Sequence, residues 1–272
     1  MPQSDLRSHS PSLVIAFRHY REDLYNHRSR DPQKKRPEWF SNSLCLTSLL
    51  VAIKACPSKN KIRLLIWYDG TEEDFATDPV IHLLTTQKEN LDIAYHRYPY
   101  GSKGDNSGER QSFPVLLKYL TEQVDDELVY LVENDYLHRP AAISALLEAF
   151  AEINDADYVN LADHRDYYHL PIHKNYHLSL HYSSNFIFKN CATSTGTFAA
   201  RRTTLARDLP VILHEPDYTF FTRLTGIHGR KLYTSIPGQA AHCMNNLLPP
   251  GVNWDRVATE TLKHLGNFTT RP

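Results

Sequence analysis

The feature that most constrains the fold is the alternation of short, almost wholly apolar runs with segments of helical periodicity. Four runs have the length and composition of buried strands, namely SLVIAF (12–17), IRLLIWYDG (62–70), LDIAYHRY (91–98) and LVYLVEND (128–135). The segments between them, such as 41–56 and 78–87, carry apolar residues at helical spacing. Strands that are buried on both faces and alternate with amphipathic helices predict an α/β fold, with a mainly parallel sheet flanked by helices. Beyond residue 160 the pattern is less regular.

The chain of 272 residues is long enough to bury a large core, and it shows no internal repeat or linker. We therefore expect a single domain over 1–272, with residues 1–11 as a flexible tail. A formal net charge of −1 excludes bulk electrostatic attraction to nucleic acid. There is no apolar signal region, no apolar run of membrane-spanning length and no C-x-x-C spacing. These features predict a cytoplasmic protein without a transmembrane segment.

The fourth apolar run ends abruptly at Glu133-Asn134-Asp135, within ELVYLVENDYLHRP. In parallel sheets, ligands bind outside the carboxyl ends of the strands. Two carboxylates at positions i and i+2, where a strand turns, can face one hard cation such as Mg²⁺ or Mn²⁺. Alternatively, Asp135 caps a helix that begins near Pro140, and Glu133 lies in a solvated turn.

The loop YGSKGDNSGERQS (100–112) is a second candidate site. Its three glycines allow backbone N–H groups to approach a phosphate or a sugar closely, although a surface turn would have a similar composition. The loop matches neither the dinucleotide fingerprint nor the P-loop. The strand-end rule also selects the polar positions that follow the first and second strands, around Arg18 and at Asp69.

The order of these parts resembles the GT-A (Rossmann-like) fold of nucleotide-sugar glycosyltransferases. In that family an Asp-x-Asp triplet holds a divalent metal against the diphosphate of the donor, and here the triplet is Glu-Asn-Asp. The resemblance implies Mn²⁺ or Mg²⁺ as cofactor, a UDP- or GDP-sugar as donor, and an irregular C-terminal portion on the acceptor side. It implies metal ligation by Glu133, Asp135 and the late His242, and donor binding by Phe17, Arg18, His19, Asp69, Gly104, Arg110 and Asn134.

The segment HEPDYTFF (214–221) provides the catalytic candidates. Inverting members of the family keep a carboxylate before a helix at this point, where it deprotonates the acceptor hydroxyl. We expect Asp217 to be this base, with Glu215 as the alternative, because Pro216 separates two acids that are usually adjacent in the family. The other interpretation is a helix cap and first-turn pair that stabilises the helix dipole.

Two further patterns have weaker functional interpretations. Four histidines recur at every fourth position from His169 to His181, but Pro171 interrupts any helix, so we interpret the stretch as a loop that shapes the acceptor pocket. The basic run Lys34-Lys35-Arg36 is either a solvated segment or a flap over the donor diphosphate.

The predicted activity is metal-dependent transfer of a sugar from a nucleoside-diphosphate donor to a hydroxyl of a carbohydrate or glycoconjugate, with inversion. One alternative is a sugar-phosphate nucleotidyltransferase, but that class carries a Gly-rich signature after the first strand and AFRHYREDLY (16–25) has no glycine. The other is a catalytically silent module of the same fold that binds glycans or a protein.

Overall fold

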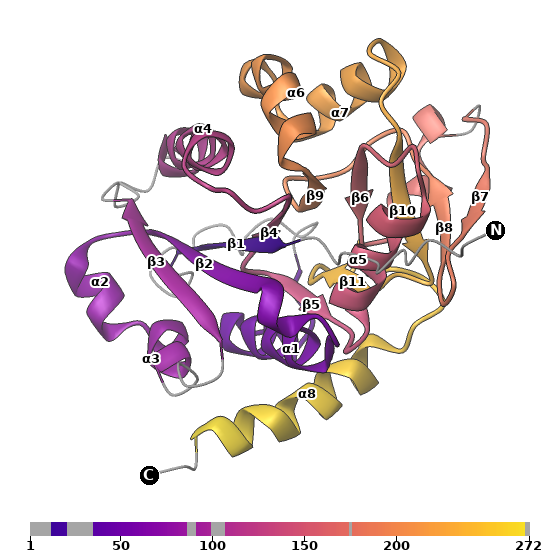
Figure 1. Cartoon of the computed structure of the whole chain (residues 1–272). Helices are drawn as coiled ribbons and strands as arrows, with labels where there is room; N and C mark the ends of the chain where they lie inside the picture. The colour runs from indigo at the N-terminus through magenta and orange to yellow at the C-terminus, as the bar shows by residue number, and fades with distance from the viewer. Residues whose placement is uncertain (1–11, 21–34, 86–90, 99–106, 174–175, 270–272) are drawn as a thin grey trace, which may run out of the picture.

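The computed structural model describes residues 12–20, 35–85, 91–98, 107–173 and 176–269. Its centre is a nine-stranded sheet in the order β3-β2-β1-β4-β9-β6-β10-β8-β7 (Figure 1). The strands are β1 Leu13–His19, β2 Ile62–Asp69, β3 Asp92–Tyr98, β4 Leu128–Glu133, β6 Tyr158–Asn160, β7 Leu180–Tyr182, β8 Ile187–Asn190, β9 Phe198–Arg201 and β10 Leu232–Ile236. The first four strands in this order are mutually parallel, whereas β9 and β8 run antiparallel to both of their neighbours.

Helices cover both faces of the sheet, as Figure 1 shows. One face packs against α1 (Asn42–Ala55), α3 (Pro79–Thr85) and α5 (Ala142–Glu152). The other packs against α4 (Ser107–Glu122), α6 (Arg202–His214) and α7 (Asp217–Gly226). The short α2 (Glu72–Thr77) follows β2, and α8 (Trp254–Thr269) packs on the outer side of α1.

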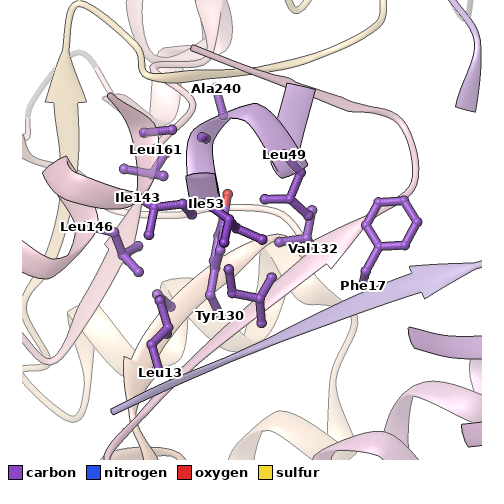
Figure 2. Close-up of a cluster of buried hydrophobic side chains, with 14 of the residues drawn as sticks. Leu13, Phe17, Leu49, Ile53, Tyr130, Val132, Ile143, Leu146, Leu161 and Ala240 are labelled. Carbon is purple, nitrogen blue, oxygen red and sulfur yellow. The ribbon is translucent and has the colours of Figure 1, made fainter. Parts of the chain in front are cut away.

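The two cores follow from the two-residue period of the strands. In β1, Leu13, Ile15 and Phe17 enter the core beneath α1, whereas Val14 and Ala16 enter the core beneath α4 and α6. Figure 2 shows Leu13 and Phe17 among the labelled side chains of the first core. Each fully buried aliphatic or aromatic side chain contributes about 1.5–3 kcal/mol relative to exposure, which is why the apolar runs become the central strands.

The prediction of an α/β fold with a mainly parallel sheet and flanking helices is confirmed by this architecture. The first strand continues to His19, beyond the expected end at Phe17, and the fourth ends at Glu133. The predicted tail 1–11 lies outside the described residues.

Between α5 and α6 the described chain consists of short strands and single turns, in agreement with its irregular sequence pattern. The histidine-rich stretch forms 3-10 turns at Arg165–Tyr168 and Pro171–His173, followed by β7. None of the helices in the described part of the chain has the length and hydropathy needed to cross a membrane.

Candidate functional site

The candidate site lies where β4 passes into a small second sheet. Two residues after the end of β4, the chain forms β5 (Tyr136–His138), which pairs antiparallel with β11 (Ala240–His242). This pairing sets His242 opposite Tyr136, and the backbone N–H of Cys243 donates to the carbonyl of Asp135 at 2.9 Å. The ladder therefore places His242 beside Asp135, although the two residues are far apart in the sequence.

Asp135, His242 and Arg36 form a charged group that we call the Asp135 cluster. Oδ2 of Asp135 lies 3.0 Å from Nε2 of His242 and 2.8 Å from Nη1 of Arg36. Oδ1 of Asp135 is buried and has no hydrogen-bond partner among the described residues. Asp135 does not cap α5, because the N-cap of that helix is Ala141, without a side-chain hydrogen bond.

The charged groups of the cluster shift the pKa values of Asp135 and His242 toward the ionised forms. Burial alone would raise the pKa of Asp135, but the charge and hydrogen bond of His242, followed by those of Arg36, outweigh it and hold the pKa well below its usual range. Burial would lower the pKa of His242, and the neighbouring Asp135 carboxylate outweighs that effect and raises it. Asp135 is therefore ionised at neutral pH, and His242 is biased toward its cationic form.

Arg36 is a member of the site that the sequence interpretation did not include among the binding residues. Its guanidinium lies 4.6 Å from the ring centroid of Phe40 and donates to the carbonyl of Cys243 at 3.1 Å. The basic run thus contributes a half-buried cation to the strand end, whereas Lys34 lies outside the described residues.

Glu133 is held by Arg18 of β1 and by Thr197, which directly precedes β9. Oε1 lies 3.3 Å from Nη1 of Arg18, and Oε2 accepts from the hydroxyl of Thr197 at 3.3 Å. A Cβ at Gly196 would lie 3.2 Å from Oε1, so only a glycine gives the carboxylate its full room. The guanidinium of Arg18 in turn lies over Phe113, 4.7 Å from the ring centroid.

The three predicted metal ligands do not form a ready three-ligand group, and within the described ranges no three His, Cys, Asp or Glu side chains are arranged to hold a metal. Asp135 and His242 fit a smaller protein contribution. Oδ1 of Asp135 has no partner among the described residues and is the atom left for a cation. His242 would ligate a cation only as neutral imidazole, because its Nε2 is hydrogen-bonded to Oδ2 of Asp135 at 3.0 Å. Such cations commonly take one or two protein ligands and complete their shell with substrate phosphate and water.

His19 and Asn134 form an internal polar chain at the end of β1. Nδ2 of Asn134 lies 3.1 Å from the carbonyl of Tyr20 and also 3.1 Å from Nδ1 of His19. Because the carbonyl can only accept, Nδ2 donates to both, and the proton of His19 is on Nε2, which lies 2.9 Å from Asp78. Burial would raise the pKa of Asp78, and the hydrogen bonds from His19 and from the backbone N–H of Val80 outweigh it and lower the pKa. These two residues therefore anchor the turn that carries Asp135.

Of the remaining predicted donor residues, Phe17 and Asp69 lie toward the carboxyl ends of β1 and β2. Phe17 is fully buried, and its ring belongs to the apolar core, so a donor would not meet its side chain. Asp69 ends β2 and pairs with Tyr98 of β3. Arg110 is in the first turns of α4, but its side chain lies outside the described residues, as does Gly104 altogether.

The two acceptor-side acids flank the junction of α6 and α7. Glu215 ends α6, and its carboxylate accepts from Nη1 of Arg223 at 2.6 Å. Asp217 is the first residue of α7, and its side chain is outside the described part of the chain. Pro216 is the N-cap and makes no side-chain hydrogen bond, so the cap interpretation does not hold for Glu215.

Tyr136 is another site residue that sequence reasoning did not select. Its ring stacks on His242 with centroids 4.9 Å apart, and its hydroxyl lies 2.7 Å from Oγ1 of Thr195. Tyr136 thus connects the Asp135 cluster to the Thr195–Thr197 segment that precedes β9. Its position directly after the acidic triplet was the available signal.

No protein-family model matches the sequence, and no curated protein matches it. Among solved structures, the chain is similar to the crystal structure of S. aureus TarS 1–349, with 12% sequence identity and a TM-score of 0.48. The match covers 82% of this chain and 57% of that one, so the chain spans little more than half of the similar structure. A likeness at this level concerns the general arrangement of elements, and activity has to be argued from the site.

Proposed function

We propose that this protein is a glycosyltransferase that moves a sugar from a nucleoside-diphosphate donor to a hydroxyl acceptor. The observation that carries the proposal is the Asp135 cluster, in which a buried carboxylate at the carboxyl end of a parallel strand has one oxygen without a partner in the described part of the chain. A buried, ionised carboxylate with a free oxygen is costly unless a ligand or cation completes it.

The chemistry of the cluster suits a diphosphate. Arg36 presents a planar guanidinium, which matches phosphate oxygens in a bidentate manner, and His242 adds a second positive group beside it. Arg18, held by Glu133 on the next strand, provides a third cation at the same edge. These groups would bind and orient the diphosphate so that its negative charge is balanced as the sugar leaves.

Asp135, through Oδ1, is the residue that would hold Mn²⁺ or Mg²⁺, with Glu133 as a further candidate. His242 would join it only in its neutral form, after release of the proton that favours its pairing with Asp135. A bound cation would supply Lewis-acid stabilisation of the leaving diphosphate. In this proposal the donor is a UDP- or GDP-sugar, and the acceptor is a carbohydrate or glycoconjugate.

For the acceptor, we propose Asp217 as the base that takes the hydroxyl proton in a single inverting displacement. Its position at the first residue of α7 supports this role, because the positive end of a ten-residue helix favours the ionised carboxylate. Glu215 is the alternative, but its carboxylate is already paired with Arg223.

The test is a panel of UDP- and GDP-sugars incubated with the protein in Mn²⁺, in Mg²⁺ and in EDTA, with release of nucleoside diphosphate as the readout. We expect slow, metal-stimulated release from one donor, and faster release when an acceptor is supplied. Binding of a donor without any release would instead identify a silent binding module. Pyrophosphate formed from a nucleoside triphosphate and a sugar phosphate would identify a nucleotidyltransferase.

A further inference from the structure

His164 is a buried histidine whose ring has no hydrogen-bond partner in the part of the chain that the structure describes. It follows β6 and is 3% exposed, and its backbone is fixed by hydrogen bonds to Ala162 (2.9 Å) and from Tyr167 (3.1 Å). Neither Nδ1 nor Nε2 has a partner among the described residues. Two unpaired nitrogens on one buried ring are unusual, because each unsatisfied buried polar atom costs about 1–3 kcal/mol.

Three aromatic rings hold the imidazole of His164 next to the Asp135 cluster. Its centroid lies 6.4 Å from that of Tyr136, 5.7 Å from that of Tyr167 and 6.3 Å from that of His242, with an edge-to-face geometry in each case. The orientation of the ring is therefore set by packing, and its nitrogens are free to serve another molecule.

Two atoms of the neighbouring Asp135 cluster are in the same condition. Oδ1 of Asp135 and Nδ1 of His242 are buried and unpartnered, within the described residues. By contrast, the hydroxyl of Tyr167 is used, since it donates to the carbonyl of Thr193 at 2.8 Å and accepts from Asn160 at 3.1 Å. His164 and the Asp135 cluster therefore share unmet hydrogen-bonding capacity that a ligand would satisfy.

The chemistry of an imidazole ring indicates what kind of group His164 would bind. A neutral imidazole has one N–H donor and one nitrogen acceptor. This combination matches a hydroxyl, which both accepts and donates, better than it matches a phosphate, which only accepts.

We propose that His164 binds a hydroxyl of the sugar carried by the donor. This inference rests on the proposed function, in which the diphosphate lies against Asp135 and joins the sugar to the nucleoside. The predicted donor residues Arg18 and Asp69 are on β1 and β2, on one side of β4, whereas His164 follows β6 on the other side, so we assign the sugar to the side of His164. His164 would then contribute to the choice of sugar, while the Asp135 cluster binds the diphosphate common to all donors.

The experiment compares the affinities of a nucleoside diphosphate and of the corresponding nucleotide sugar by calorimetry, in the presence of Mn²⁺, for wild type, His164→Phe and His164→Asn. The Phe variant keeps a flat ring among the three aromatic neighbours but removes both nitrogens. We expect it to bind the nucleotide sugar about tenfold more weakly and to bind the nucleoside diphosphate as wild type does. His164→Asn, which retains a donor and an acceptor, should recover part of the loss. His173→Phe is the matched control, because its ring also packs on Tyr167, at 5.2 Å.

The outcomes distinguish failure of the His164–sugar contact from failure of the proposed glycosyltransferase function. If wild type prefers the nucleotide sugar and His164→Phe keeps that preference in full, the sugar contact is wrong while the glycosyltransferase proposal stands. An equal loss for both ligands would also overturn the contact, since it would place His164 at the diphosphate or in the support of the site. If wild type binds neither ligand from the donor panel, the proposed function fails and this inference fails with it.

Discussion

His138 should make the protein less stable in mild acid, and replacing it should remove that sensitivity. The residue lies in β5, is 1% exposed and has Nε2 within 3.0 Å of the hydroxyl of Tyr130. Burial lowers the pKa of His138 to about 4 in the folded protein. An unfolded histidine titrates near its ordinary value of about 6.5.

The sign and the size of the effect follow from this difference. Because the pKa of His138 is lower in the folded state, the unfolded chain binds the proton first as the pH falls, and stability is lost between about pH 6.5 and pH 4. pH 5 lies about 1.5 units below the pKa of the unfolded histidine, and each unit corresponds to about 1.4 kcal/mol of unfolding free energy. His138 should therefore cost about 2 kcal/mol of unfolding free energy between pH 7 and pH 5.

The assay is urea unfolding of wild type and His138→Gln at both pH values. Glutamine does not titrate, and its amide can still hydrogen-bond to Tyr130. The loss of stability from pH 7 to pH 5 should be about 2 kcal/mol smaller in the variant. The matched control is His228→Gln, at an exposed position, which should behave like wild type. The same pH dependence in wild type and His138→Gln would refute the reasoning.

Two other predictions address the support and the chemistry of the site. Lys189 and Asp163 form a buried ion pair, with Nζ 2.7 Å from Oδ1 and side chains 5% and 1% exposed. Lys189→Met should lower the unfolding free energy by about 3–5 kcal/mol, which corresponds to about 6–20 °C in Tm. Adding Asp163→Asn should restore much of the lost stability, because it removes the uncompensated buried charge. A loss below about 1 kcal/mol in Lys189→Met would contradict the stabilising role of the ion pair. Asp217→Asn should reduce turnover about 10²-fold with donor affinity preserved. NMR of the first product should show the inverted anomer, and the donor's own configuration would exclude Asp217 as the base.

The parallel half of the sheet could be predicted because its signal is local. Each of its strands is a run of apolar residues, and the acids that end β4 are adjacent to the run itself. The residues at which the strands end were predicted less accurately. The first strand continues to His19, so the side chain of Phe17 enters the core and does not reach the edge of the sheet.

The composition of the site depends on contacts between segments that are distant in the sequence, and the sequence pattern predicts such contacts only weakly. The position of His242 beside Asp135 results from the pairing of β5 with β11, and only the order of elements suggested it. Arg36 belonged to a basic run that also suits a solvated segment. His164 follows the end of β6, so the strand-end rule could have selected it. However, the chain has 15 histidines, and only the structure shows that the ring of this one has no hydrogen-bond partner among the described residues.

The most direct test of the account is the metal-dependent affinity of a nucleoside diphosphate for wild type and for Asp135→Asn. Asparagine keeps the shape of the side chain and can still accept from Arg36, but it removes the carboxylate charge. The matched control is Glu260→Gln, which removes an exposed acid of α8 that pairs with Arg256. Circular dichroism would confirm that each variant is folded, and His242→Gln would replace Asp135→Asn if that variant does not fold.

We expect wild type and Glu260→Gln to bind UDP or GDP more tightly in Mn²⁺ than in EDTA. Asp135→Asn should bind UDP or GDP more than about tenfold more weakly than wild type in Mn²⁺, because a hydrogen bond to a charged group contributes about 1.5–3 kcal/mol. His242→Gln should lose less, because the carboxylate of Asp135 remains and the glutamine amide can still hydrogen-bond to it. Unchanged Mn²⁺-dependent affinity in folded Asp135→Asn would contradict the placement of the diphosphate and its cation at Asp135.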